Sequence, residues 1–288
     1  MIDTDFLRQL NRFSLILQKR ITSSYTGERR STMIGQGLLF KDHTQYAMGD
    51  DFRKIDWRVF ARTDKYYVKR YEEERNLTIH IIVDFSASMN FGKPTSKSDY
   101  ASMLGIGFAY MATKDNERFV LSTFSEKLDL FSPKKGAKQL AGIVAYLNDR
   151  KPVGATKFEE SMAKYKNKIS SKSMIIVISD FLYDLSEIKN SLARLKGHEI
   201  VLIQVLDKTE RDLSLEGEYK LQDLETKQVV KTFISPSLRK TYLKQLNEHQ
   251  AKIKKICDQM NAKFFIASND KPIFDTFFEV LMSRYFQR

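Results

Sequence analysis

The feature that most constrains the fold of this chain is a set of short segments made almost entirely of aliphatic residues. The runs M-I-I-V-I and I-V-L-I-Q-V-L, within residues 173–180 and 199–206, show no alternation of polar and apolar positions. A strand of this kind must be covered on both faces, as the strands of a parallel sheet are. Stretches with helical spacing separate these runs, so the sequence predicts an α/β fold with a doubly wound, mostly parallel sheet.

The hydrophobic periods also predict the order of the elements. Strands are predicted at residues 77–84, 118–124, 127–131, 173–180, 199–206 and 262–267. Helices are predicted at residues 3–20, 98–114, 135–148, 158–169, 185–196, 236–260 and 272–286. Gly197 is expected to close the helix that precedes it, and a polar hairpin is expected around residues 223–227.

The length of 288 residues suits one full domain with a smaller appendage. Residues 22–51 hold no sustained period, which predicts an extended or small β segment packed on the sheet domain behind a first helix. A stretch dense in both charge signs follows at 50–75 and contains Trp57, the only tryptophan. We expect this stretch to be a salt-bridged clasp anchored by Trp57, with a partner-binding face as the alternative. The predicted division is therefore an N-terminal segment, 1–76, and an α/β domain, 77–288.

The charge balance raises the question of an anionic partner. The chain has 48 Lys and Arg against 36 Asp and Glu, a net charge of +12. The predicted helix at 236–260 is rich in lysine, and we interpret it as a solvated outer helix of the sheet. Since no nucleic-acid-binding motif accompanies it, a basic nucleic-acid-binding protein is retained only as an alternative function.

Apolar length and cysteine content indicate where the chain is expected to work. The apolar runs at 79–83 and 105–112 are far shorter than the roughly 18 to 20 residues that span a bilayer. The first residues are acidic and no apolar leader segment follows, so we expect neither export nor membrane insertion. The single cysteine, Cys257, excludes an internal disulfide and fits a reducing compartment, so a cytoplasmic location is expected.

A candidate metal site begins at the carboxyl end of the first predicted buried strand. The segment H-I-I-V-D-F-S-A-S-M places Asp84, Ser86 and Ser88 at alternate positions of one short loop. Alternation lets a carboxylate and two hydroxyls converge, which is the hard-oxygen chemistry that a magnesium-type ion prefers. The alternative interpretation is a turn in which these side chains cap local backbone groups.

Two further residues extend this set. Thr156 follows the Gly154 turn, and Asp180 ends another predicted buried strand. Both are expected at the same edge of the sheet, since ligands bind at the carboxyl ends of parallel strands. The five residues together predict a site for a divalent cation, with Mg²⁺ expected first and Ca²⁺ or Mn²⁺ as alternatives.

These residues resemble those of a known family. In order and separation, Asp84, Ser86, Ser88, Thr156 and Asp180 resemble the metal-ion-dependent adhesion site of von Willebrand factor A domains. The segment G-Q-G-L-L-F-K-D-H-T-Q-Y-A-M-G-D-D-F-R-K-I-D-W-R-V-F-A-R (35–62), followed by Y-V-K-R-Y-E-E-E-R (67–75), is similar to the signature of the domain-of-unknown-function 58 family. The resemblance covers roughly residues 20–270 and implies a von Willebrand factor A-like domain at 77–288.

The resemblance also implies roles for the site residues. Ser86 and Ser88 would ligate the ion directly, Thr156 directly or through water, and Asp84 and Asp180 through coordinated waters. An open coordination position would then accept a carboxylate from a partner protein. The implied function is a non-enzymatic adaptor that works with a MoxR-type AAA+ ATPase on an unidentified client protein. Phe181 stands where many A domains have glycine, which makes the backbone there less permissive.

Enzymatic functions find less support in the sequence. His43, His80, His198 and His249 are scattered without zinc-binding spacing. No nucleophile elbow or complete phosphate-binding loop is present. A metal-dependent hydrolase using Asp84 and Asp180 remains an alternative, but it needs a general base that the sequence does not offer.

Overall fold

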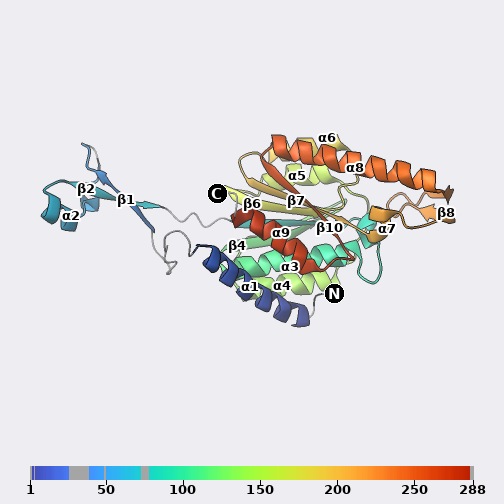
Figure 1. Cartoon of the computed structure of the whole chain (residues 1–288), viewed down its shortest axis with the longest axis horizontal. Coiled ribbons are helices and arrows are strands. Elements are labelled where there is room, and N and C mark those ends of the chain that lie inside the picture. Colours follow the sequence, from blue (N-terminus) through green and yellow to red (C-terminus); the bar gives the residue numbers. More distant parts are fainter. Residues whose placement is uncertain (1, 3, 26–38, 49, 73–77, 286–288) are drawn as a thin grey trace. The chain divides into compact units, whose positions relative to one another are not determined.

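A computed structural model describes residues 2, 4–25, 39–48, 50–72 and 78–285 (Figure 1). The chain divides into two compact units, Ser24–Asn76 and Met1–Ser23 together with Leu77–Arg288. The junctions between the units lie near residues 23 and 76. Nearly all of the first helix, Thr4–Tyr25, groups with the larger unit, whereas the predicted division placed it in the N-terminal segment, 1–76.

The larger unit is built around a six-stranded sheet in the order β10-β7-β6-β3-β4-β5. All neighbouring pairs are parallel except β4 and β5, which are antiparallel. The strands are β3 (Thr78–Asp84), β4 (Arg118–Phe124), β5 (Leu128–Asp129), β6 (Ser173–Ser179), β7 (Glu199–Leu206) and β10 (Ala262–Ser268). The predicted α/β fold with a mostly parallel sheet is confirmed, although β5 is shorter than the predicted 127–131.

Both faces of this sheet are buried, as the aliphatic runs require. In β6, Met174, Ile176 and Ile178 belong to one hydrophobic cluster. The alternate residues Ile175 and Val177 belong to a second cluster. Because successive strand residues point to opposite faces, the division places one hydrophobic layer on each side of the sheet.

Helices cover each of these layers (Figure 1). One face packs against α1 (Thr4–Tyr25), α3 (Lys97–Lys114), α4 (Ala137–Asp149) and α9 (Ile273–Tyr285). The other face packs against α5 (Phe158–Lys166), α6 (Leu185–Arg194) and α8 (Pro236–Gln259). This two-sided cover makes the sheet doubly wound.

Helix α1 is held on the larger unit by aromatic contacts. The ring centroids of Phe13 and Phe274 lie 5.1 Å apart, and those of Phe6 and Phe274 lie 6.2 Å apart. Helix α3 approaches α9 closely at Gly107, where an added Cβ would lie 1.8 Å from the Phe277 ring. The lack of a side chain at position 107 therefore permits the α3–α9 packing on which α1 rests.

Several element ends differ from the prediction. Helix α6 ends at Arg194 with Leu195 as its C-cap, so the predicted cap at Gly197 is wrong. Gly197 instead takes a left-handed φ of +99° in the turn beyond. Two short helices, η2 (Ala87–Asn90) and α7 (Lys208–Asp212), follow buried strands where only loops were expected.

The expected hairpin is confirmed and forms a separate two-stranded sheet. Its strands, β8 (Gly217–Gln222) and β9 (Val229–Ile234), are antiparallel and flank the turn at 223–227. Among the described helices of the chain, none combines the length and apolar character needed to cross a membrane.

The described part of the smaller unit contains two strands and two short helices. These are β1 (Leu39–Gln45), η1 (Phe52–Lys54), α2 (Trp57–Thr63) and β2 (Tyr67–Glu72), with β1 antiparallel to β2. Parts of the family-like signature, at 35–38, 49 and 73–75, lie outside the described residues. Residues 26–38 and 49 of the predicted extended segment at 22–51 also lie outside the described residues.

Acidic residues in this unit act as helix caps. The Asp51 carboxylate accepts from the Arg53 amide, and the Asp56 carboxylate accepts from the Arg58 amide, each at 3.0 Å. Trp57 contacts Phe60 at 5.9 Å between ring centroids, yet 58% of its surface is exposed. Within its own unit, Trp57 therefore packs against one neighbouring ring and is not enclosed.

Candidate functional site

Asp84 is the last residue of β3 and is completely buried. Its Oδ1 accepts from the Ser86 amide at 2.8 Å, and its Oδ2 accepts from the Ser179 hydroxyl at 2.7 Å. Ser179 ends the neighbouring strand β6, so the orientation of the Asp84 carboxylate is set from two strands. These two hydrogen bonds hold the Asp84 carboxylate at the carboxyl edge of the sheet.

A chain of oxygen atoms leads from this loop to Asp180. The Ser86 and Ser88 hydroxyl oxygens lie 3.0 Å apart. The Ser88 hydroxyl donates to Asp180 Oδ2 at 2.9 Å. The structure therefore brings together four of the five predicted site residues, although Asp84 and Asp180 are 96 positions apart in the sequence.

The loop that carries Thr156 is bonded to the same edge through its backbone. The Val153 amide donates to the Phe85 carbonyl at 2.9 Å, and the Ala87 amide donates to the Gly154 carbonyl at 2.8 Å. Gly154 has a φ of +81°, and an added Cβ would lie 3.0 Å from the Glu126 side chain. Glycine at this position therefore permits both the left-handed backbone and the close approach of the turn between β4 and β5.

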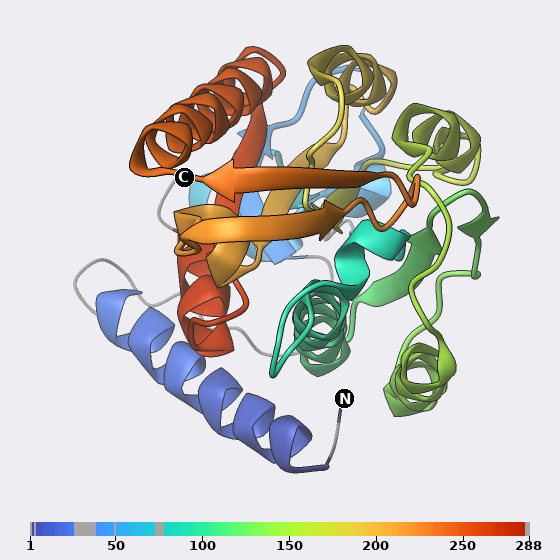
Figure 2. The same ribbon diagram turned by 90° about the vertical axis from the view of Figure 1, so that its right-hand side faces the viewer.

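The side chain of Thr156 faces a residue that sequence reasoning missed. Its hydroxyl donates to Glu225 Oε1 at 2.9 Å, and its amide donates to Glu225 Oε2 at 3.1 Å. Glu225 lies in the turn of the β8–β9 hairpin, which extends across the carboxyl edge of the sheet (Figure 2). Nothing in the local sequence of this turn points to a contact 69 residues away.

A buried lysine also belongs to the site. Lys97 Nζ is fully buried and donates to Asp180 Oδ2 and to Glu210 Oε1, both at 2.8 Å. Lys97 is the first residue of α3, and a positive charge there opposes the helix dipole. The two carboxylates offset this unfavourable placement, but both lie far along the chain, so the local sequence does not identify them.

Burial sets the proton affinities of these groups. Burial first, and the charge of Asp180 second, raise the pKa of Asp84 to about 7, although bonds from Ser179 and Ser86 act in the opposite direction. Burial alone would lower the pKa of Lys97, but Asp180 and Glu210 outweigh it and raise that pKa. Lys97 is therefore charged at neutral pH, whereas Asp84 lies near its midpoint.

The composition of the site fits a hard divalent cation. The buried Asp84 and Asp180 carboxylates and the partly exposed Glu210 carboxylate carry three negative charges when ionised, against one positive charge on Lys97. The two buried carboxylates outnumber the one buried ammonium, and the remaining negative charge is unfavourable unless a cation or protons neutralise it. The described residues contain no group of three or more His, Cys, Asp and Glu side chains placed to hold a metal, so such a site depends on the serine and threonine hydroxyls.

Phe181, the residue after Asp180, has a strained backbone. It adopts a left-handed φ of +50°, which is unfavourable for a bulky residue. Its side chain is fully buried and lies 5.9 Å from the Phe158 ring. The Phe181 carbonyl is bonded to His249 Nε2 at 2.8 Å, so packing and this bond hold the backbone that follows Asp180.

The histidines His80 and His43 and the cysteine Cys257 have surroundings typical of residues with a structural role. His80 is buried and bonded to the Tyr165 hydroxyl, and His43 pairs with Asp56 at 2.9 Å. Cys257 is buried, which raises its pKa to about 12. Helix α8 buries Leu246, Ile253 and Cys257 and exposes its lysines, as expected for an outer helix.

Comparison with solved structures gives low similarity scores. The conserved hypothetical protein BatB from Bacteroides thetaiotaomicron aligns with a TM-score of 0.45 and 13% identity, over 74% of this chain and all of that one. An aerotolerance-related membrane protein from Bacteroides fragilis gives 0.46 and 13%, with the same coverage. The pilus adhesin SpaC from Lactobacillus rhamnosus GG gives 0.47 and 12%, over 74% of this chain and 31% of the adhesin.

Proteins related in sequence align over a larger share of this chain than these solved structures do. Uncharacterized protein Mb1516 from Mycobacterium bovis and Uncharacterized protein Rv1480 from Mycobacterium tuberculosis are each 24% identical over 256 residues. The alignment covers 87% of this chain and 81% of each relative. The family model DUF58, described as a protein of unknown function, matches residues 42–252 and so extends over both compact units. This chain belongs to the DUF58 family.

Proposed function

We propose that the chain is a non-enzymatic interaction module that binds a partner protein through a divalent cation, Mg²⁺ in the first instance. The observation that carries this proposal is the connected set Asp84, Ser86, Ser88 and Asp180 at the carboxyl edge of the sheet. Its order and oxygen chemistry resemble the metal-ion-dependent adhesion site of von Willebrand factor A domains. The mostly parallel sheet with helices on both faces is consistent with such a domain.

The protein residues would hold the cation and orient its surroundings. The Ser86 and Ser88 hydroxyls are the proposed direct ligands, and Thr156 acts directly or through water. Asp84 and Asp180 are proposed to bind coordinated waters, since both Asp84 oxygens already accept protein hydrogen bonds. When bound, the cation would supply an open position for a carboxylate oxygen of the partner. Such a site recognises an acidic side chain without converting it.

The proposed partner is a MoxR-type AAA+ ATPase, with an unidentified client protein and a shared location in the cytoplasm. In this scheme the ATPase supplies nucleotide hydrolysis, and this chain supplies recognition. The absence of a phosphate-binding loop in the sequence and the oxygen-rich site support that division of roles.

Capture of a co-encoded MoxR-type ATPase by the immobilised full chain tests the proposal. Mg²⁺ should support capture and a chelator should abolish it. Asp84→Asn keeps the size and one hydrogen-bond acceptor but removes the charge, and it should weaken Mg²⁺-dependent capture at least about tenfold. Circular dichroism checks that the variant remains folded.

Asp258→Asn is the matched control, because it makes the same change of side chain at an exposed position. Asp258 lies near the end of α8, the helix that precedes β10. This variant should capture the ATPase as the unmodified chain does. Capture that is insensitive both to the chelator and to Asp84→Asn would refute the proposed function.

A further inference from the structure

The β8–β9 hairpin places a carboxylate of this chain at the proposed recognition site. Glu225 accepts two hydrogen bonds from Thr156, through its amide and its hydroxyl. The Thr156 loop is in turn bonded to Phe85 and Ala87, between the site residues Asp84 and Ser88. An acidic side chain is also the group that the proposed function assigns to the partner. Glu225 therefore has the chemistry of the partner group and a place beside the residues that would receive it.

The tip of the hairpin is organised to present Glu225. Asp223 Oδ1 accepts from the Glu225 amide at 2.7 Å and from the Thr226 amide at 2.9 Å. The Lys227 amide donates to the Asp223 carbonyl at 3.0 Å. These bonds form an Asx-type turn, which fixes the backbone of Glu225 independently of the site. The carboxylate is thus presented on an ordered turn.

The body of the hairpin, in contrast, is weakly held. Within the described residues β8 and β9 pair with each other and not with the six-stranded sheet. Val230 and Phe233 are 59% and 60% exposed. An isolated two-stranded hairpin is only marginally stable in water when its side chains are not packed against another element. Apart from Ile234 at its base, which is 1% exposed, the hairpin therefore has little buried surface to hold its tip in place.

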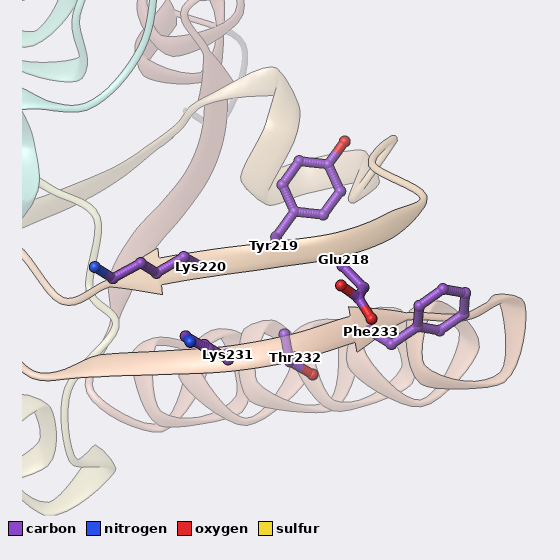
Figure 3. A pocket seen from close by; sticks show the side chains of 6 residues that line it. All are labelled: Glu218, Tyr219, Lys220, Lys231, Thr232 and Phe233. Atoms are coloured by element: carbon purple, nitrogen blue, oxygen red, sulfur yellow. The ribbon is translucent and has the colours of Figure 1, made fainter.

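The outer surface of the hairpin adds a further destabilising feature. Figure 3 shows Lys220 and Lys231 on adjacent strands, and these two residues are direct register partners. Like charges placed directly opposite each other weaken a strand pair. Both lysines are exposed, as are Glu218 and Phe233, the next pair on this surface. The pairing thus lowers the stability of a hairpin that is already poorly buried.

Release of the tip would leave no buried polar group unsatisfied. Thr156 and Glu225 are both partly exposed to solvent. Water can therefore take over the hydrogen bonds of the Thr156 amide and of the Glu225 carboxylate. The contact is accordingly reversible in energetic terms, unlike the fully buried pair of Lys97 and Asp180.

We propose that Glu225 is an internal competitor for the recognition site, and that a partner carboxylate binds after the β8–β9 hairpin has withdrawn it. This inference rests on the proposed function, because it assumes that an acidic partner group is recognised beside Thr156. Only molecules in which Glu225 has been withdrawn can then bind a partner. The apparent affinity is therefore the intrinsic affinity multiplied by the fraction of such molecules.

Glu225→Ala tests this competition directly. The variant should bind the co-encoded ATPase in Mg²⁺ about 3- to 30-fold more tightly than the unmodified chain. Hydrogen exchange at residues 217–234 of the unmodified chain should accelerate when the ATPase binds. Glu218→Ala is the matched control, since it removes an exposed acid from the same hairpin, and its affinity should be unchanged.

The outcomes separate this inference from the proposed function. If Asp84→Asn abolishes capture while Glu225→Ala leaves the affinity unchanged or weakens it, the competition by Glu225 is refuted and the proposed function stands. If neither chelator nor Asp84→Asn affects capture, the proposed function fails, and this inference fails with it. Equal gains in affinity for Glu225→Ala and Glu218→Ala would also refute the specific role of Glu225.

Discussion

Burial in strand β3 affects two titratable side chains in opposite directions. It raises the pKa of Asp84 to about 7, and it lowers the pKa of His80 to about 4 with a smaller contribution from His198. In each case the low-dielectric surroundings disfavour the charged form. His80 is bonded to the Tyr165 hydroxyl in the second hydrophobic layer, so its proton affinity reports on the core and not on the site.

His80 should make stability depend on pH below neutrality. In the unfolded chain its pKa is close to 6.5, so between pH 6.5 and 4 the unfolded state binds a proton that the folded state does not. The contribution of His80 to stability is therefore fully present above pH 6.5. As the pH falls from 6.5 to 4, protonation of this residue in the unfolded chain lowers the free energy of unfolding by about 2 to 3 kcal/mol. Urea unfolding at pH 7 and pH 4.5 measures the loss, and His80→Gln should reduce it by that amount. An equal loss in the unmodified chain and the variant would contradict this assignment.

At the residue scale, the sequence predicted candidate site residues where a local pattern marks the end of a strand or a turn. Asp84, Ser86 and Ser88 share one loop, and Asp180 follows a recognisable aliphatic strand. Lys97 and Glu225 could not be assigned, because their partners lie from 69 to 113 residues away. Contacts of that kind depend on how loops meet above the sheet, which no local pattern specifies.

At the scale of elements, the first turn of α3 connects three parts of the larger unit. Lys97 begins α3, Asp180 follows β6, and Glu210 belongs to α7. The Glu210 carboxylate also accepts from the Asp207 amide at 3.0 Å as part of the α7 capping box. The ammonium of one residue thus joins a helix start, a strand end and a short helix.

Lys97→Met should weaken this junction strongly. The substitution removes the buried cation while leaving Asp180 and Glu210 in place, which typically costs about 3 to 5 kcal/mol. Denaturant unfolding of the full chain measures the change. Lys93→Met changes an exposed lysine in the loop that precedes α3, and it should change stability by less than about 0.5 kcal/mol. Equal effects of the two substitutions would show that the buried pair does not stabilise the junction.

Regular elements were predictable to the extent that burial leaves a periodic pattern. Strands β6 and β7 are buried on both faces, so their aliphatic runs identified them within one residue. Helix α6 was predicted too long because Gly197 was taken as its cap, whereas the helix ends at Arg194 with Leu195 as its C-cap. Helix α7 has five residues, too few to leave a hydrophobic period.

At the scale of the whole molecule, the proposed site and much of the family-like signature belong to different compact units. The signature at 35–62 lies in Ser24–Asn76, while all five predicted site residues lie in the larger unit. The net charge of +12 likewise does not describe the site, where buried carboxylates outnumber the buried lysine. Average charge therefore indicates little about the ligand, and the acidic, oxygen-rich site favours a cation over a nucleic acid.

Isothermal titration of Mg²⁺ into the full chain measures whether the proposed site holds a divalent cation. One saturable site per chain is expected in the unmodified protein and in Asp258→Asn. Asp84→Asn should bind Mg²⁺ at least about tenfold more weakly. If the unmodified chain binds no Mg²⁺, or if Asp84→Asn binds it with equal affinity, these residues do not form a cation site.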